Sequence, residues 1–484
     1  MSNQTASTRT PNPSTPGLLE RLFQLSDRRS TVSREIRGGV VTFITISYIL
    51  VLNPIILAGS SSPDVEGNFL DAVQVASATA LASGLLTILF GLVANLPFAL
   101  SAGLGINSFL AVSMVHQVTW PEAMGLVFLN GVIIVILGAT GARTAIFHAV
   151  PAALKSAITV GIGMFIAFVG LVNSGFVTRA EGTPVQLGFG GSITTVPTVI
   201  FVVTLLLMAI LLVRKVPGAI LIGMVVGTVI ALVVEAIWHI GAAGAENPGG
   251  WGLTVPTLPK TIVSVPDLGL IGEFDLFGSF ARIGPVAALM LLLTLVFMNF
   301  FDAMGAMTGL ARNAGLANED GTFPRIRQAF IIEGLGAVVG GATSTSSNTI
   351  YVDSASGIGE GARTGLASVV TGLLFVIAMF FTPLAVVVPM EVGSAALVVV
   401  GAMMMAGVSD IEWHDIAVAI PTFLTIITMP LTYSIANGIG VGFVSWVIIH
   451  AFSGRARQVH WLLWVVAAGF IIFFARTPLE SLLG

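Results

Sequence analysis

The stretch STSSNTIYVDSASGIGEG, at residues 344–361, differs from the sequence on either side of it. Long runs of Val, Leu, Ile, Phe, Ala and Gly flank it, whereas the stretch itself holds Ser, Thr and Asn residues, one Tyr and the carboxylate of Asp353. Such residues favour turns and caps over helix interiors. A polar, poorly helical segment where a membrane span is expected therefore requires a physical reason.

Composition defines the class of protein. The chain has 484 residues, of which 55% are hydrophobic and only 9% are charged. Soluble globular proteins carry about 25% charged residues, so most of this surface must face lipid. The sequence therefore predicts an all-α polytopic membrane protein. The chain has no Cys and six scattered His, so we expect no metal or cofactor, and its net charge of −4 gives no indication of nucleic acid as a partner.

Apolar segments of about 20 residues are long enough to cross a bilayer. By this criterion about fourteen spans are predicted, seven on each side of a Pro- and Gly-containing loop at 241–278. They lie near 38–59, 71–95, 97–117, 121–140, 155–174, 194–213, 217–240, 283–311, 328–342, 344–360, 364–382, 384–407, 416–434 and 436–453. A last apolar block at 461–475 is either a further span or an interfacial segment.

Charge and polarity predict the organisation around these spans. Residues 1–36 form a tail, polar and disordered at first, with a short amphipathic helix at 18–25. Lys and Arg residues gather at alternate junctions, which places the N-terminus inside and the protein in the cytoplasmic membrane. We expect one seven-span repeat at 37–240, an extracytoplasmic loop at 241–278, a second repeat at 279–476 and a tail at 477–484.

Seven spans in each half give the halves opposite orientations, which is the layout of an inverted repeat. The third span of each half is short, polar and rich in Gly or Ser, at 95–109 and in the opening stretch. Interrupted spans at matching positions point to a transporter's binding site. We expect extended chain at 97–102 and 343–352, pairing as short strands, followed by half-helices near Gly105 and Ser354.

Two carboxylates stand out within these spans. Asp302 lies in the middle of an apolar segment, where a charge costs at least ~2.5 kcal/mol. Within its helix, Arg282 and Arg312 are about 30 and 15 Å away, so a buried ion pair is disfavoured and desolvation favours the protonated acid. Asp353 is either a ligand acceptor or only the N-cap of its half-helix. Glu333 is a weaker third acid, which could instead pair with Arg327.

Neutral side chains add weaker candidates. Three amides could bind a ligand or simply hold helices together, namely Asn107, Asn299 and Asn348. Four phenylalanines are individually weak candidates to stack on a flat ligand, namely Phe43, Phe109, Phe300 and Phe301. The methionines of AMMMAG, at 402–407, are expected to serve packing.

Six stretches carry a family resemblance: REIRGGVVTFITISYILVLNPIIL, ALSAGLGINSFLAV, VPAALKSAITVGIGMFIAFVGLVNSG, FFDAMGAMTGLARNAGL, YVDSASGIGEGARTGL and IPTFLTIITMPLTYSIANGIGVGF. In this order they resemble nucleobase–cation symporter family 2, and more closely its adenine–guanine–hypoxanthine permease branch. The resemblance implies fourteen spans as two inverted repeats, a core and a gate domain, and strand-to-half-helix breaks in spans three and ten.

The resemblance also implies the site residues. The site acids would be Asp302 and Asp353, a polar residue of span three would be Asn107, and the acid of span nine would be Glu333. The chain departs from the branch at four positions. It has Asn299 in place of a second acid, and Asp353 in place of Glu. Where the branch has Thr, it has Ala303 and Ala306, and these changes reshape the pocket.

The function predicted is import of a purine nucleobase by proton symport, not an enzymatic activity. Substrate binding is assigned to Asp302, Asp353, Asn107, Asn299 and Ser354, and proton coupling to Asp302 and Glu333. The expected partners are the purine and the lipid bilayer, with a homodimer as a further expectation.

Three alternatives were weighed against this function. An anion transporter on a similar fold needs a cation near the half-helices, yet 95–109 and 343–359 contain no Lys or Arg. An intramembrane aspartyl protease needs YD and GxGD patterns, which neither Asp has. A uracil- or xanthine-type permease of the same superfamily remains open.

Overall fold

The computed structural model describes residues 17–483 except 59–61, 142–149, 181, 245–246, 253, 260, 319–321 and 386. Apart from Gly17, the segment expected to be disordered lies outside these residues. The elements of the first half are α1 (Leu18–Phe23), α2 (Val32–Ile46), α3 (Ile49–Leu57), α4 (Ala72–Ala94), β1 (Leu100–Ala102), α5 (Leu104–Phe109), the π-helical turn η1 (Leu110–Met114), α6 (Trp120–Thr140), α8 (Ala152–Asn173), β2 (Val177–Thr178), β3 (Gln186–Leu187), α9 (Val196–Val213) and α10 (Ala219–Trp238).

The second half again contains long helices and a short strand that leads into a half-helix. Its elements are α11 (Gly278–Ile283), α12 (Pro285–Asn313), α13 (Ile326–Ala342), β4 (Asn348–Ile350), η2 (Val352–Ser354), α14 (Ala355–Gly359), α15 (Gly365–Ala378), η3 (Met379–Phe381), α16 (Thr382–Ala385), α17 (Met390–Met404), η4 (Met405–Asp410), α18 (Ile416–Leu431), α19 (Ile435–Phe452), η5 (Ala456–Gln458) and α20 (Trp461–Leu483).

The predicted polytopic membrane fold is confirmed. Ten helices among the described residues are long and apolar enough to cross a bilayer, and shorter apolar helices occupy 104–114, 416–431 and 461–475. The block at 461–475 begins α20, which packs against α19 and α12. The first predicted span is divided into α2 and α3, with Ser47 and Tyr48 between them.

The two interrupted spans meet as the sequence predicts. Strands β1 and β4 pair antiparallel, with Leu100 opposite Ile350, and the six paired residues are all buried. The pairing extends on both sides, since the Gly103 amide donates to the Ser347 carbonyl and the Tyr351 amide to the Ala99 carbonyl. These bonds satisfy backbone groups that lie at membrane depth without a helix around them.

Ser and Thr hydroxyls satisfy further backbone groups in and near the paired strands. The Thr87 hydroxyl of α4 bonds to the backbone of Leu100, and the Ser368 hydroxyl of α15 donates to two carbonyls at 96 and 98. The Ser83 and Ser101 hydroxyls lie 2.7 Å apart and share a hydrogen bond. Ser and Thr residues on neighbouring helices therefore replace the water that a strand end would otherwise need.

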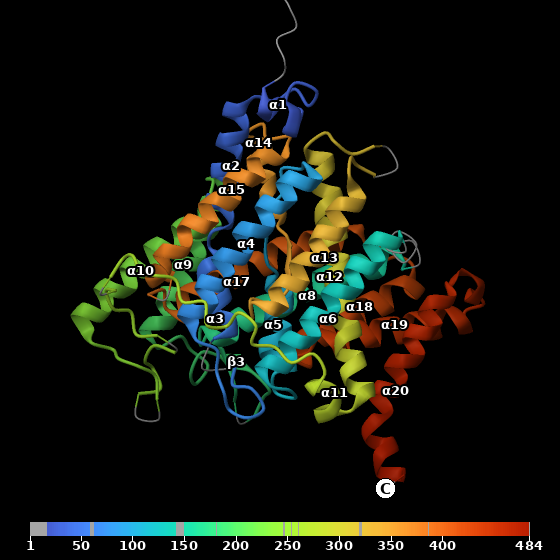
Figure 1. Cartoon of the computed structure of the whole chain (residues 1–484). Helices are drawn as coiled ribbons and strands as arrows, with labels where there is room; N and C mark the ends of the chain where they lie inside the picture. Colours follow the sequence, from blue (N-terminus) through green and yellow to red (C-terminus); the bar gives the residue numbers. More distant parts are fainter. Residues whose placement is uncertain are drawn as a thin grey trace, which may run out of the picture.

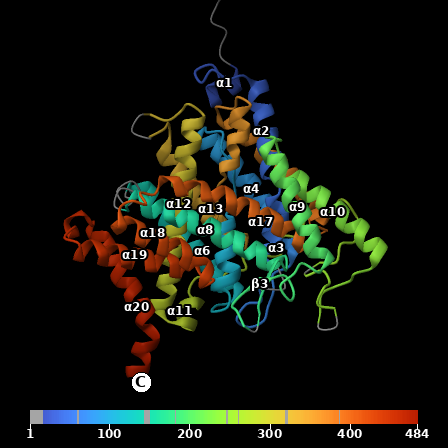
Figure 2. The ribbon, with the colours of Figure 1, turned by 180° about the vertical axis from the view of Figure 1, so that it is seen from behind.

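Helix packing relates the two halves by exchange of equivalent spans. In the centre of the molecule α4 packs along α15, and α13 packs along α6. We call these four helices, with α12 and the two strand-to-helix breaks, the central group. Around it lie the outer helices, of which α8 packs against α17, α9 against α10 and α18 against α19. Figures 1 and 2 show α9 and α10 on one side of the molecule and α18 to α20 on the other. Each pairing maps onto another when the first half is exchanged for the second, as expected for an inverted repeat.

The N-terminal segment covers one end of the central group. Phe23 and Leu25 are buried against Leu366 at the start of α15. The Asn95 side chain, at the end of α4, donates to the Phe23 carbonyl and accepts from the amide of Gly365. Figure 1 shows α1, α2 and α14 together at this end. The short helix expected at 18–25 is present as α1.

Glycines permit the closest helix contacts. A Cβ atom on Gly91 of α4 would overlap the carbonyl oxygen of Gly365 on α15, and one on Gly131 of α6 would overlap the backbone of α13 at Val338. Small residues are the usual means by which membrane helices approach closely.

We predict that Gly91→Ala destabilises the fold by about 1–3 kcal/mol, because the added methyl group forces α4 and α15 apart. Gly309→Ala is the matched control, since a Cβ atom on Gly309 meets nothing within 4 Å and α12 gains a better helix former. Thermal unfolding in detergent, followed by tryptophan fluorescence, measures both. Equal melting temperatures for the two variants would contradict the argument.

Candidate binding site

A cavity of about 380 Å³ lies where the two strand-to-helix breaks face α12, α8 and α17. Cavities that hold small organic ligands begin at about 300 Å³. The wall combines the start of α5, from Gly103 to Ile106, with Thr349 to Asp353 of the second break. The opening stretch of the sequence is therefore polar because it pairs with β1 on one side and lines a cavity on the other.

Two acids contribute side chains to this cavity. Asp302 lies on α12, and the α12 residues of the wall include 298, 302, 306, 309 and 313, which form one stripe of the helix. Asp353 lies in the 3-10 turn η2. In the described part of the chain, neither carboxylate forms an ion pair and the cavity wall contains no Lys, Arg or His. The site can therefore accept hydrogen bonds but has no cation to hold an anion.

Asp353 is not a helix cap. The N-cap position of η2 is occupied by Tyr351 and that of α14 by Ser354, and neither end shows a side-chain capping bond. The alternative that Asp353 serves only as an N-cap is therefore wrong. Its side chain is partly exposed to the cavity.

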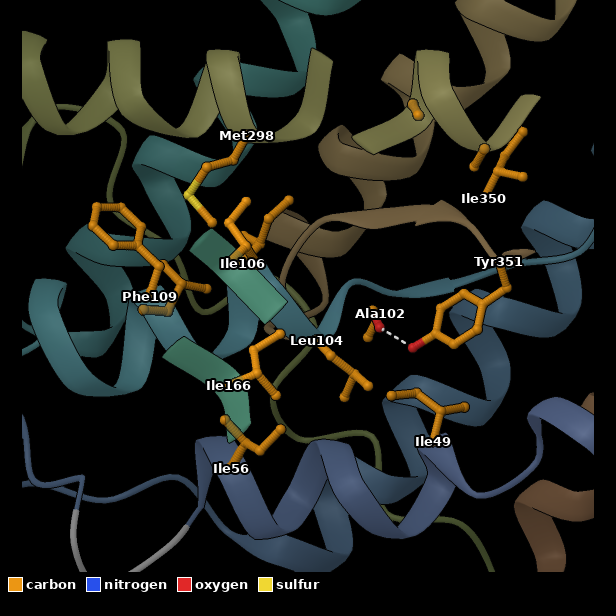
Figure 3. Packing of buried hydrophobic residues seen from close by; sticks show 14 of the residues in the cluster. Ile49, Ile56, Ala102, Leu104, Ile106, Phe109, Ile166, Met298, Ile350 and Tyr351 are labelled. Carbon is orange, nitrogen blue, oxygen red and sulfur yellow. Dashed lines mark hydrogen bonds between the residues drawn. The ribbon is translucent and has the colours of Figure 1, made fainter. Parts of the chain in front are cut away.

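Two tyrosines flank this carboxylate, and neither was expected from the sequence. The Tyr48 hydroxyl lies 3.5 Å from Oδ2 of Asp353, and the Tyr351 hydroxyl donates to the Ala102 carbonyl at 2.6 Å. Figure 3 shows the second bond at the end of β1. A signal was available, because the chain has only three Tyr and Tyr351 lies two residues before Asp353.

The aromatic lining differs from the one expected. None of the described side chains of Phe43, Phe109 and Phe300 belongs to the wall, and Phe43 packs edge-on against Phe375 instead. The side chain of Phe301 lies outside the described residues. The flat surfaces of the site are thus the tyrosine rings, whose centroids are 6.4 Å apart.

The opposite wall is apolar. It consists of side chains from the central group and from the outer helices, namely Ile162, Met298, Val400, Met403 and Met404. Two residues of the methionine run expected to serve packing therefore also line the cavity. Methionine adapts its shape to a ligand, so this wall can close on a flat ring without a fixed outline.

The other candidate residues lie behind the wall. Asn107 is fully buried and donates to the side chain of Asn53, which in turn donates to Thr79 and to the carbonyl of Thr345. The Ser354 hydroxyl accepts from the amide of Ala99. Both residues hold the breaks in place, and their assignment to substrate binding stays a prediction.

Asn299 and Glu333 are also fully buried and lie outside the cavity wall. Glu333 lies on α13, and both α13 and the helix of Asp302, α12, pack against β4. Of the positions that depart from the branch, Asp353 and Ala306 line the cavity and Ala303 does not.

The cavity opens toward one end of the molecule. Its wall continues along α12 to Gly309 and Asn313, both of which are exposed. The loop that follows α12 leads to Arg325, which donates to the carbonyl of Val93 at the end of α4. The cavity therefore opens toward the end of the molecule that carries α1 (Figure 1).

The other side of α5 is sealed by apolar packing. Figure 3 shows Ile106, Phe109, Ile166 and Met298 around this helix. A Cβ atom on Gly105 would come within 2.8 Å of Ile162 on α8. On this side the described wall of the cavity is thus formed by closely packed apolar side chains.

Comparison with known proteins agrees with this geometry. The family model described as "Permease family", that of the xanthine/uracil permeases, matches residues 33–441. The chain is 38% identical over 459 residues to a guanine/hypoxanthine permease of Bacillus subtilis, covering 94% of this chain and 99% of that protein. It is 33% identical over 460 residues to an adenine permease of Escherichia coli, covering 94% and 96%.

Solved structures with the same fold include the transmembrane domain of a cyanobacterial bicarbonate transporter, with a TM-score of 0.59, 14% identity and coverage of 84% of this chain and 97% of that one. A murine solute carrier 26 anion transporter gives a TM-score of 0.57, 12% identity and coverage of 92% and 74%. These likenesses support the inverted-repeat transporter fold. By sequence, the chain belongs to the xanthine/uracil permease family and resembles its guanine/hypoxanthine and adenine permeases.

Proposed function

We propose that this permease imports a purine nucleobase by proton symport. The observation that carries the proposal is a cavity with two carboxylates, two tyrosines and no described basic side chain, placed between the breaks of spans three and ten. The names of the relatives, guanine/hypoxanthine permease and adenine permease, support the same class of substrate.

The chemistry of a purine fits this wall. A purine is flat and carries N–H donors beside ring acceptors. The carboxylate of Asp353 accepts two N–H bonds, while first-turn amides of α5 that no side chain caps can donate to ring acceptors. The tyrosine rings and the methionine wall cover the faces. Asp302 supplies a second acceptor across the cavity. Asn107, Asn299 and Ser354 lie behind the wall and support the residues that contact the base.

Proton coupling is assigned to Asp302 and Glu333. A neutral base brings no charge, so accumulation against a gradient needs a coupled ion. Protonation of Asp302 from outside removes its charge from the central group, which we propose to move. When the cavity opens to water on the inside, the charged form is favoured and the proton is released. We assign the exchange of this proton with Asp302 to Glu333, on α13.

Orientation and domain motion complete the proposal. The basic residues near α1 assign that end, and the N-terminus, to the inside of the cytoplasmic membrane. The opening at Gly309 and Asn313 then corresponds to release of substrate inward. We assign 37–240 and 279–476 to the two repeats, with the central helices as the core and α8 to α10 and α17 to α19 as the gate. A homodimer is tested by the mass of the purified protein.

Anion transport on the same fold is the main alternative, since two structural neighbours carry anions by name. Those likenesses are below 15% identity and establish the fold alone. Two carboxylates with no described cation in the wall disfavour an anion, because the repulsion is not offset. A uracil-type permease of the same superfamily is distinguished by competition.

Competition identifies the substrate class. In whole cells or liposomes, uptake of labelled hypoxanthine should be inhibited by hypoxanthine, guanine, adenine or xanthine at micromolar concentrations. Nucleosides should not compete, because a ribose does not fit the closed site. Uracil serves as the control for the sister class, and bicarbonate and sulfate for the anion transporters. Inhibition by the anions and by none of the purines would refute the proposal.

Asp353→Asn should abolish binding of hypoxanthine, because an amide offers one acceptor where the base needs two and leaves a mismatch of about 1–3 kcal/mol or more. Asp353→Glu should keep part of the activity and change the preference among bases. Isothermal titration on purified protein measures both variants. Wild-type affinity in the Asn variant would exclude Asp353 from the site.

Asp302→Asn mimics the protonated acid permanently. This variant should bind hypoxanthine and exchange it across the membrane, yet fail to accumulate it against a gradient. In the wild type we expect binding to weaken toward alkaline pH as Asp302 ionises. Binding by the Asn variant should not show this decrease between about pH 5 and 8. Counterflow in liposomes and uptake with and without a protonophore separate these steps. Accumulation that is still sensitive to the protonophore would transfer the coupling role to Glu333 or Asp353.

A further inference from the structure

Tyr48 occupies an unusual position in the first span. It lies between α2 and α3, where the amide of Val51 donates to the Tyr48 carbonyl three residues earlier, in a tightened turn. The Thr45 and Ser47 hydroxyls bond back to carbonyls of the preceding turn, an arrangement that bends helices. The bend places the Tyr48 ring in the cavity wall beside the second break.

The hydroxyl of Tyr48 faces the carboxylate of Asp353. It lies 3.5 Å from Oδ2 of Asp353, a long separation for an O–H···O bond. The ring itself is almost fully buried, at 1% exposure, so the hydroxyl cannot turn to bulk water. A small closure of the cavity around a ligand would shorten this contact.

The other tyrosine of the wall cannot take this role. The Tyr351 hydroxyl is already bonded to the carbonyl of Ala102, which fixes the end of β1. Ser354, next to Asp353, is fully buried outside the cavity wall, and its hydroxyl oxygen accepts from the amide of Ala99. Among the described residues, Tyr48 is thus the side-chain donor directed at this carboxylate.

The geometry points to Tyr48 as the positioning residue that orients Asp353 and keeps it ionised for the substrate. This inference rests on the proposed function and names a part of that site. A bond from Tyr48 occupies one acceptor site of Oδ2, so Oδ1 and the second site of Oδ2 can accept the two N–H groups of the base. It also stabilises the charge, because hydrogen bonds to a charged acceptor are stronger than those to a neutral one.

The consequence is a specific effect on the pH profile of binding. Besides Tyr48, the groups that face Asp353 are Tyr351 on its own segment and Asp302 on α12, while the cavity residues of α8 and α17 are uncharged. Binding should fall at acidic pH as Asp353 is protonated and at alkaline pH as Asp302 ionises. Loss of the Tyr48 hydroxyl favours protonation of Asp353, so it should move the acidic limb to higher pH and leave the alkaline limb in place.

Tyr48→Phe tests this inference. At neutral pH the variant should bind hypoxanthine roughly three- to tenfold more weakly, as expected for loss of one hydrogen bond. Its acidic limb should move up by about half a pH unit. Tyr433→Phe is the matched control, because this third tyrosine packs against Phe165 and Phe168 outside the cavity wall. A double-mutant cycle with Asp353→Glu should show non-additive losses.

An infrared titration with isotope-labelled aspartate provides a readout without substrate. The protonated-carboxyl band of Asp353, identified by its loss in Asp353→Asn, should appear at higher pH in Tyr48→Phe than in the wild type. If the Phe variant does not fold, Tyr48→His and Tyr48→Met give the same comparison with and without a donor.

The outcomes separate the two proposals. If the wild type binds no purine, the proposed function fails, and the infrared titration alone decides whether Tyr48 controls Asp353. If the wild type binds hypoxanthine while Tyr48→Phe keeps both the acidic limb and the infrared titration unchanged, the role of Tyr48 is overturned and the function stands.

Discussion

The pairing of β1 with β4 is the constraint on which the rest of the structure depends. Extended backbone at membrane depth exposes amides and carbonyls that no lipid can satisfy. Here each strand satisfies the other, and Thr87 and Ser368 bind carbonyls and an amide next to the pairing. Because the strands come from opposite halves, this pairing joins the two halves at the point around which α4 packs along α15 and α6 along α13. It also fixes where both half-helices begin, and so where the cavity lies.

The cavity lies where two kinds of packing meet. Within the central group, glycines bring backbones into contact, as Gly91 does with Gly365, so these helices pack closely against one another. Between the central group and α8, the contact at Gly105 is made by side chains such as Ile162. Contacts between flexible apolar side chains can slide at lower cost than backbone contacts held by hydrogen bonds. The arrangement suits motion of the central group past the outer helices.

The charged side chains in the wall limit the kind of ligand that this cavity can hold. An inverted-repeat scaffold with half-helix N-termini at its centre offers amides to any acceptor, including an anion. In this chain Asp302 and Asp353 add acceptors beside those amides, and the described wall contains no basic residue. Donors and acceptors side by side match a neutral heterocycle. The fold supplies the location of the cavity, and these side chains give it acceptors for hydrogen bonds.

Composition and residue patterns along the chain predict the class, the approximate spans, the two interrupted spans and two acids within spans, Asp302 and Asp353. These features follow from local composition, because a charge or a polar run within an apolar segment is visible without any partner. Only the tertiary structure decided that Asn107 bonds to Asn53, that Ser354 holds β1 and that Met403 and Met404 line the cavity. It also brought Tyr48 to Asp353, 305 positions away. Which face of a membrane helix meets a cavity depends on its neighbours, and apolar residues on both faces leave no periodic signal.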